Sequence, residues 1–369
     1  MTHPLDTLSL NRYPEDRSGT LVAADAADRY LLQQAVATPS DTPPLVINDS
    51  FGALACALHT QAPHSWGDSW LAWQALQDNL LANQLDPAGM HFFNSQTLPT
   101  GTYQQVLLRI PKSLALLEQQ LYQLRPLLAP GAQVIAGAML KHLPPSAGDL
   151  LAKYIGPYQA SLAWKKARLL TATLDPDLTP PAPRQDPRYT LEGTTIELDN
   201  FPGVFSRERL DVGTRALLPQ LPKDAGNSHI IDLGCGNGAL GIMAAWHNPE
   251  AQLTFVDESW AAVACAEHNF RQAFGQRPAD FRVRDGVQQW DGAPADWILC
   301  NPPFHQQQVI GDVIARRLFA GSRRALKPEG CLLVVGNRHL GYHQTLKRNF
   351  SRVEQVASHP KFVVLAARL

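Results

Sequence analysis

The sequence predicts two α/β domains in tandem, each built on a mostly parallel β-sheet, and three observations support this fold class. The chain has 369 residues, a length that suits two domains of about 150–200 residues. Five prolines fall within residues 175–188, a density that excludes a helix or a central strand and indicates a linker. Strand-like and helix-like patterns alternate on both sides of this stretch. We therefore expect domains at 1–174 and 189–369, joined by a linker at 175–188.

The alternation is clearest in the C-terminal half. Short apolar runs typical of strands occur at 228–233, 252–256, 280–284, 296–300 and 331–335. Helix-like segments lie between them, at 238–247, 259–274 and 313–326. This regular order predicts a parallel sheet covered by helices. Two last strand-like runs, at 352–357 and 362–367, are close enough to form a hairpin, which would add an antiparallel strand at the edge of the sheet.

The N-terminal half has the same rhythm, which favours an internal duplication. An apolar run at 45–47 leads to Gly52-Ala53-Leu54, which aligns with Gly238-Ala239-Leu240 of the second half. The alignment brings three further pairs together: Asp68 falls close to Asp257, Asn79 close to Asn269, and Ile110-Pro111-Lys112 near Asn301-Pro302-Pro303. Chance similarity between two α/β domains is the alternative explanation.

Composition and charge exclude several classes of protein. The net charge is −1, so composition alone does not indicate a polyanion partner, and any basic surface must be local. None of the five cysteines belongs to a C-x-x-C pair or a Cys/His cluster with zinc spacing, so we expect no metal. The polar N-terminus lacks a signal peptide, and no apolar run reaches the roughly 18 residues of a membrane span. These features predict a soluble, cytoplasmic protein.

A glycine-rich turn follows the first strand of the C-terminal half and reads Asp232-Leu233-Gly234-Cys235-Gly236-Asn237-Gly238. Glycines let the backbone turn tightly and approach a ligand closely. The N-terminus of the following helix supplies free N–H groups and a positive dipole end, which suit a carboxylate. The spacing differs from the G-x-G-x-x-G turn of dinucleotide enzymes and resembles the cofactor loop of class I methyltransferases, which use S-adenosylmethionine. We expect Asp232, Gly234, Gly236 and Asn237 to bind that cofactor.

Two carboxylates end the next strands. Asp257 has two acceptor oxygens, which suit the two hydroxyls of a ribose, although a local turn bond is the alternative. Asp285 follows the third strand and is a candidate for binding the adenine amino group or, alternatively, for capping a turn.

The most informative motif is Asn301-Pro302-Pro303-Phe304, which follows the apolar strand at 296–300. Prolines fix the backbone and lack N–H donors, so neighbouring carbonyl groups are left to accept bonds from a ligand. The side-chain oxygen of Asn301 and the carbonyl of Pro302 can accept hydrogen bonds from one exocyclic amino group, and Asn301 also borders the cofactor. Phe304 offers a face for base stacking. The alternative is a proline-rich turn with a core phenylalanine.

The segment at 204–214 precedes the glycine-rich turn and includes Phe205. It is expected either to cap an amphipathic helix or to cover the methionine end of the cofactor. In the second case Phe205 lies near the base pocket.

These motifs together resemble those of the bacterial ribosomal RNA guanine-N(2)-methyltransferases. The resemblance rests on V-F-S-x-x-x-L-D-x-G-T, D-L-G-C-G-N-G, V-D-E-S and C-N-P-P-F-H, and it extends over nearly the whole chain. Residues 114–120, Trp164-Lys165-Lys166-Ala167-Arg168 and Asn337-Arg338-His339-Leu340 are similar to the large-subunit enzyme in particular.

The resemblance implies two tandem Rossmann-like class I methyltransferase domains, of which the N-terminal one has lost its cofactor loop. It implies catalytic roles for Asn301, Pro302 and Phe304. The acceptor would be a guanosine 2-amino group in large-subunit ribosomal RNA, as naked RNA or an early assembly form. The first domain would dock RNA or support the second.

Basic clusters are candidates for RNA contact. Lys165, Lys166 and Arg168 form one cluster, and a second is expected on the helix at 313–326, with Arg316, Arg317, Arg323, Arg324 and Lys327. Either could instead be an ordinary solvated face.

Four other functions remain open. A small-subunit ribosomal RNA guanine methyltransferase shares the motifs, and a protein glutamine methyltransferase also uses N-P-P, usually followed by Tyr. A DNA adenine methyltransferase would need a target-recognition insert that the sequence lacks. A non-catalytic RNA-binding assembly factor would not be expected to retain Asp232, Gly234, Gly236 and Asn301.

Overall fold

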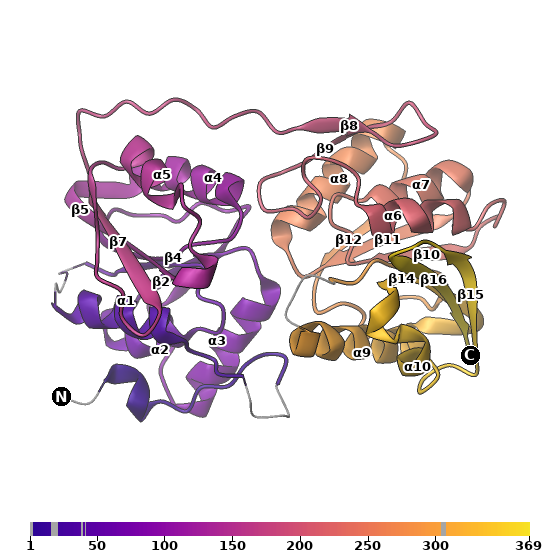
Figure 1. Cartoon of the computed structure of the whole chain (residues 1–369), viewed down its shortest axis with the longest axis horizontal. Helices are drawn as coiled ribbons and strands as arrows, with labels where there is room; N and C mark the ends of the chain where they lie inside the picture. Colours follow the sequence, from indigo (N-terminus) through magenta and orange to yellow (C-terminus); the bar gives the residue numbers. More distant parts are fainter. Residues whose placement is uncertain (1–2, 16–20, 38–39, 41, 304–307) are drawn as a thin grey trace. The chain divides into compact units, whose positions relative to one another are not determined.

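The computed structural model describes residues 3–15, 21–37, 40, 42–303 and 308–369, with the backbone alone at 308–312. The chain divides into two compact units, Met1–Gln185 and Asp186–Leu369 (Figure 1). Each is an α/β unit with a seven-stranded mixed sheet. No helix among the described residues is both long and apolar enough to cross a membrane.

The first unit has the strand order β3-β2-β1-β4-β5-β7-β6. The strands are β1 (Leu45–Ile47), β2 (His64–Gly67), β3 (His91–Asn94), β4 (Tyr103–Arg109), β5 (Leu128–Met139), β6 (Tyr158–Ala160) and β7 (Ala167–Thr173). The helices are α1 (Ala26–Ala37), α2 (Ala53–Ala57), α3 (Trp70–Ala82), α4 (Leu114–Leu124) and α5 (Ala147–Tyr154). Helices α1 and α2 cover one face of the sheet and α4 and α5 the other, as Figure 1 shows.

The second unit has the equivalent order β12-β11-β10-β13-β14-β16-β15. Its strands are β10 (His229–Leu233), β11 (Gln252–Asp257), β12 (Asp280–Val283), β13 (Ala295–Cys300), β14 (Leu326–Asn337), β15 (Arg352–Ser358) and β16 (Phe362–Arg368). Its helices are α6 (Val212–Leu217), α7 (Ala239–His247), α8 (Trp260–Phe274), α9 (Gln308–Ala325) and α10 (Tyr342–Leu346). Strands β8 (Arg188–Thr190) and β9 (Glu197–Asp199) form a separate two-stranded sheet.

The second sheet has the expected character. Its five first strands pair in parallel, and every residue of β10 is buried, including His229 and Asp232 beside the apolar Ile230, Ile231 and Leu233. The predicted hairpin is present: β16 pairs antiparallel with β14 and lies between it and β15. Strand β14 begins at Leu326, earlier than the sequence predicts, because the strand runs through Pro328 and Gly330 with a register shift in its pairing to β13. Lys327 therefore lies on a strand and not on the predicted helix.

Strand register relates the two units residue by residue. Ile47 pairs with Trp66 and Leu108, while Leu233 pairs with Val256 and Cys300. Gly67 therefore stands where Asp257 does, and Arg109 stands where Asn301 does. The prediction that placed Ile110 opposite Asn301 is wrong by one residue, because the alignment on Gly52 and Gly238 carried no information about the length of the intervening loops.

Candidate active site

The glycine-rich turn connects β10 to α7 at the carboxyl edge of the second sheet, where open α/β sheets bind ligands. Gly234, Gly236 and Gly238 have φ values of 73°, 54° and 87°, a left-handed backbone that only glycine adopts readily. A Cβ at Gly238 would also lie 3.1 Å from that of Ala266. The turn is thus shaped to bring backbone N–H groups close to a ligand.

Asp232 lies wholly buried beneath this turn. One carboxyl oxygen, Oδ2, accepts a 2.8 Å hydrogen bond from the Gly241 amide, and the other, Oδ1, is buried with no partner. Burial, with a smaller contribution from the nearby charge of Asp257, raises the pKa of Asp232 to about 8. A buried polar atom without a partner is expected to bond to a ligand or a water molecule. The residues present therefore fit S-adenosylmethionine, whose methionine end has donors to satisfy that oxygen.

Asp257 ends the adjacent strand β11 and leans against the same turn. Its Oδ2 accepts a 3.0 Å bond from the Gly236 amide and its Oδ1 a 3.1 Å bond from the Ser259 amide. A carboxylate has two acceptor oxygens, which suit the two hydroxyls of a ribose. The backbone bonds hold the carboxylate in a fixed place beside Gly236.

Two further predicted cofactor residues, Asn237 and Asp285, are engaged elsewhere. The side-chain Nδ2 of Asn237 donates to Tyr189 and to Asn200, each at 2.7 Å, so this side chain ties the turn to the segment before α6. A cofactor contact from Asn237 would therefore come from its backbone. Asp285 is mostly buried and forms an ion pair with Arg317 of α9.

Asn301 directly follows β13 at the same edge of the sheet. Its side-chain Nδ2 donates to Asp211 Oδ2 at 3.0 Å and to Thr214 Oγ1 at 2.9 Å. Its Oδ1 is buried and accepts no hydrogen bond. Pro302 is buried next to it and Pro303 is exposed, whereas Phe304 lies outside the described residues. The amide is thus held by its nitrogen, with the oxygen left to accept a bond from a ligand.

Sequence reasoning did not identify Asp211 and Thr214 as part of this site. Asp211 is the N-cap of α6 and accepts a 3.0 Å bond from the Thr214 amide. The D-x-x-T spacing at a helix start was the available signal, but it indicates only a cap. Phe205, in the same segment, is 50% exposed, which leaves part of its ring accessible for stacking.

The basic cluster of the first unit lies at a tight turn. Lys165 and Lys166 have φ values of 45° and 65° and form the turn between Trp164 and Ala167, which exchange backbone hydrogen bonds. Both lysines are exposed, and Lys165 Nζ lies 4.8 Å from the centre of the Trp164 ring. Arg168 follows on β7, half-buried, with a buried Nε that has no partner. The lysines therefore project, while Arg168 is partly enclosed.

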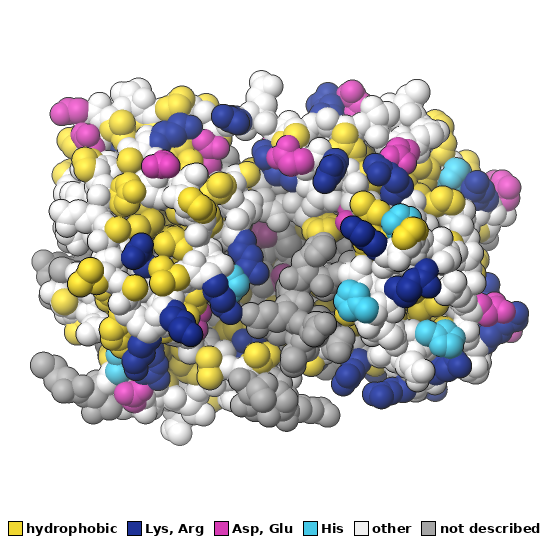
Figure 2. All heavy atoms as spheres, in the orientation of Figure 1, with side chains coloured by type: hydrophobic (Ala, Val, Ile, Leu, Met, Phe, Trp, Pro, Cys, Tyr) yellow, Lys and Arg dark blue, Asp and Glu magenta, His cyan; other side chains and the backbone are white. Residues whose placement is uncertain are grey.

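Two members of the second predicted basic cluster form internal ion pairs, and a third donates to an amide. Arg317 pairs with Asp285, Arg324 donates to Gln288, and Lys327 pairs with Asp296 at 2.7 Å. Figure 2 shows that Lys and Arg side chains are scattered over the visible face of each unit among acidic and apolar ones. This mixture agrees with the net charge of −1.

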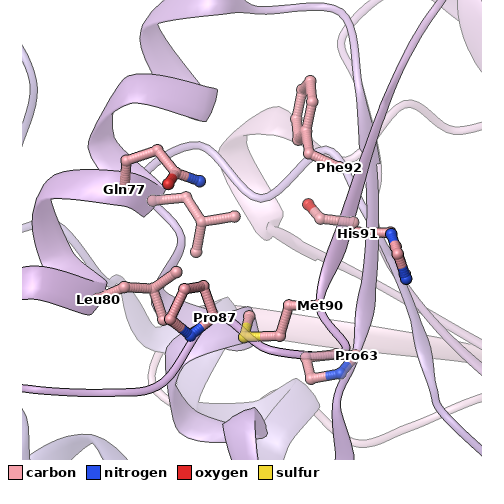
Figure 3. A pocket seen from close by; sticks show the side chains of 9 residues that line it. Pro63, Gln77, Leu80, Pro87, Met90, His91 and Phe92 are labelled. Carbon is pink, nitrogen blue, oxygen red and sulfur yellow. The ribbon is translucent and has the colours of Figure 1, made fainter.

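A pocket in the first unit lies apart from these residues. Figure 3 shows it between α3 and β3, with Gln77 and Leu80 on one side and His91 and Phe92 on the other. None of the candidate residues lines it. Among the described residues there is no group of three or more His, Cys, Asp or Glu side chains that could hold a metal ion.

Comparison with known proteins gives a match along the whole chain. Residues 1–176 match the family model of the RLMG N-terminal domain, and residues 195–366 match that of the methyltransferase small domain. A protein of Stutzerimonas stutzeri named ribosomal RNA large subunit methyltransferase G is 53% identical, over 98% of this chain and 97% of its own length. A protein of Pseudomonas putida with the same name is 52% identical, over 100% of this chain and 99% of its own length.

A solved structure has the same two-unit fold. It is that of the T. thermophilus 16S rRNA N2 G1207 methyltransferase in complex with AdoMet and guanosine. It matches with a TM-score of 0.78 and 21% identity, over 93% of this chain and 92% of that one. Both units therefore have the class I methyltransferase fold, and from its end-to-end similarity to these relatives the chain belongs to the ribosomal RNA large subunit methyltransferase G family.

Proposed function

We propose that this chain transfers a methyl group from S-adenosylmethionine to the exocyclic 2-amino group of a guanosine in large-subunit ribosomal RNA. The family and its relatives' names support ribosomal RNA as the acceptor. The observation that carries the choice of an amino group is the amide of Asn301, which is held by its nitrogen and presents a buried, unpaired oxygen. Such an oxygen accepts a hydrogen bond and cannot donate one, which suits an amine.

We assign the cofactor to the carboxyl edge of the second unit. Asp257 would accept bonds from the ribose hydroxyls, Asp232 and the turn at Gly234 and Gly236 would hold the methionine end, and Asn301 would border the methyl group. The bound cofactor supplies an electrophilic methyl group. Asp285 remains a candidate for the adenine side, where a contact must share the carboxylate with Arg317.

The chain's own contribution to the reaction is mainly positioning. The Asn301 oxygen and the Pro302 carbonyl would each accept a hydrogen bond from one N–H group of the amino group. This arrangement would direct the nitrogen lone pair toward the methyl group. As the nitrogen gains positive charge, these two oxygens stabilise it, and the proton that is then lost passes to solvent. Phe205 and Phe304 are proposed to stack on the guanine.

We further propose that residues 1–174 dock RNA or support the second unit, and that residues 189–369 carry the reaction. Lys165 and Lys166 favour RNA docking because they are exposed. Arg168, which is half-buried, is included in the proposed contact. Four members of the second cluster, Arg316, Arg323, Arg324 and Lys327, are also exposed. Within the unit, however, Arg317 and Lys327 form ion pairs and Arg324 donates to Gln288.

The test is transfer of labelled methyl groups to 23S ribosomal RNA prepared from cells that lack this protein, followed by nucleoside analysis. Naked 23S RNA, early assembly particles, mature large subunits and 16S RNA are compared as acceptors. We expect N2-methylguanosine in 23S RNA, with naked RNA or early assembly particles preferred to mature subunits. A methylated ribose, ring carbon or protein glutamine, or preferential methylation of 16S RNA, would contradict the proposal.

A further inference from the structure

Asp211 and Thr214 form a matched pair of acceptors around the nitrogen of Asn301. They lie at the N-cap and in the first turn of α6, and Asn301 follows β13. The Nδ2 group has two protons, and the two bonds of 3.0 and 2.9 Å use both of them. Every donor of this amide is therefore used within the protein.

This pairing fixes which way the amide points. An ionised carboxylate accepts hydrogen bonds and donates none, so a flipped amide would place its oxygen against the Asp211 carboxylate. The flip would exchange a charge-assisted hydrogen bond for a repulsion between two oxygens. With Nδ2 held toward Asp211 and Thr214, the oxygen of Asn301 must face the opposite side, where it is buried without a partner.

In the first unit, the residues at the positions of Asp211 and Thr214 also bind the side chain of the residue that follows the fourth strand of the order, β4. Asp25 lies at the start of α1 as Asp211 does at the start of α6, since each carbonyl accepts a bond from the amide four residues on. Asp28 then corresponds to Thr214. These two carboxylates bind the guanidinium of Arg109, at 2.7 and 2.8 Å, and Arg109 occupies the position of Asn301.

We propose that Asp211 and Thr214 are positioning residues: they set the orientation of the Asn301 amide so that its oxygen faces the acceptor amine. The negative charge of Asp211 also polarises the amide and makes that oxygen a stronger acceptor. The inference deepens the proposed function and rests on it for the identity of the amine.

Four variants separate orientation from helix capping. Serine and asparagine are good N-caps, so Asp211→Ser and Asp211→Asn keep the cap of α6. Asp211→Ser withdraws the acceptor from Asn301, and Asp211→Asn keeps an oxygen but removes the charge. Thr214→Val removes the hydroxyl at similar volume, and Thr214→Ser restores it. Ser69→Ala, which removes the N-cap of α3 in the first unit, is the control for loss of a cap alone.

The expected result is a loss of kcat with unchanged cofactor affinity. Asp211→Ser should lower kcat by about 10- to 100-fold, the usual effect of removing a partner that orients a ligating side chain. Asp211→Asn and Thr214→Val should lose less, and Thr214→Ser and Ser69→Ala should stay close to the unaltered enzyme. Because Asp211 is proposed to act through Asn301, the double variant Asp211→Ser, Asn301→Ala should be no slower than Asn301→Ala alone.

A second measurement needs no substrate. In protein labelled with ¹⁵N at asparagine, the side-chain signal of Asn301 is assigned by its loss in Asn301→Ala. It should move in Asp211→Ser and Thr214→Val and stay in place in Thr214→Ser and Ser69→Ala. Three results would overturn the inference. The first is a loss of kcat in the double variant that equals the product of the two single-variant losses. The others are an Asn301 signal that does not move and a cofactor affinity that falls along with kcat. A product other than N2-methylguanosine from the unaltered enzyme would instead overturn the proposed function, and the signal test would still stand.

Discussion

The carboxyl edges of the two sheets share a scaffold but differ in most of the groups that are proposed to face a ligand. Asn79 and Asn269 are both fully buried, and each donates to the backbone carbonyl of the turn after the first strand, Phe51 at 2.8 Å and Asn237 at 2.9 Å. Ser69 and Ser259 cap corresponding helices. The bonds that hold each edge in shape are therefore present in both units.

The groups that would meet a cofactor are present in the second unit alone. Gly67 stands in place of Asp257, and Asn48 and Ser50 stand in place of Gly234 and Gly236. Asp49 accepts bonds from the amides of Ala53 and Ala55, and Ala55 corresponds to Gly241, the partner of Asp232. A buried carboxylate thus survives in the first unit as a helix cap, although it comes from a different position in the chain.

The first edge satisfies its own polar groups. Asn48 exchanges hydrogen bonds with Gln120, and Arg109 binds Asp25 and Asp28. In the second unit, Asp232 and Asn301 each keep one buried oxygen without a partner. Among the residues compared at the two edges, a buried oxygen without a partner is found at Asp232 and Asn301, in the unit proposed to carry the reaction.

The largest effect is expected where the two edges differ most in chemistry. Asn301→Ala removes the oxygen that aligns the amine and stabilises its growing charge, so methyl transfer should fall by roughly 100- to 1,000-fold. Cofactor affinity should change little. The measurement pairs the RNA methylation rate with calorimetry of S-adenosylmethionine binding, and near-normal turnover would refute the assigned role.

Phe304 permits a related distinction at the same motif. Phe304→Ala should weaken RNA binding as well as turnover, because it removes a stacking surface worth about 1–3 kcal/mol. Phe304→Tyr keeps the ring face and should retain much of the activity. Equal losses in both variants, measured as KM and kcat for RNA, would argue against stacking.

The next effect concerns the carboxylate that the first unit lacks. Asp257→Ala should weaken S-adenosylmethionine binding by about 10- to 150-fold, which corresponds to roughly 1.5–3 kcal/mol for hydrogen bonds to a charged group. Asp68→Ala, one residue beyond Gly67 in the first unit, is the matched control and should leave affinity unchanged. If calorimetry gave the same S-adenosylmethionine affinity for both variants, the assignment of the cofactor to the second unit would be contradicted.

A smaller effect is expected on RNA affinity. Replacing Lys165, Lys166 and Arg168 with Gln should flatten the dependence of log K on log salt by about 0.7–0.9 for each phosphate that these side chains no longer neutralise. Cofactor affinity should not change. The same slope measured for Arg316→Gln, Arg323→Gln tests the exposed part of the second cluster. If the slope does not change in the variant without Lys165, Lys166 and Arg168, these side chains do not contact RNA phosphates.

A separate effect concerns the dependence of stability on pH. The pKa of Asp232 is raised by burial to about 8, above its ordinary value in an unfolded chain, so the folded protein holds an extra proton between about pH 4 and pH 8. The associated stability is present below pH 4 and is lost as pH rises through 8. Asp232→Asn cannot ionise, so its melting temperature relative to the unaltered protein, without cofactor, should rise from pH 5 to pH 8.5. A constant difference would show that Asp232 is ionised throughout.

The sequence predicted the strands of the second sheet to within one residue at each end, except β14, because most of them are short apolar runs bounded by turn residues. Its limits appear where a side chain's partner lies far along the chain. Asp211 and Asn301 are 90 residues apart, and the ion pair of Asp285 with Arg317 spans 32. Periodicity and local spacing cannot predict contacts between residues so far apart. The sequence therefore indicated the helix cap at Asp211 but not its hydrogen bond with Asn301. Register likewise needed the sheet itself, which moved the counterpart of Asn301 from Ile110 to Arg109.

The most direct test of the difference between the two edges is the number of cofactor molecules that one chain binds. Titration of the full-length protein with S-adenosylmethionine by calorimetry should give one site per chain. In Asp257→Ala that same site should weaken, with no second site left at the original affinity. Two sites per chain, or one site that is indifferent to Asp257, would contradict the assignment of the cofactor to the second unit.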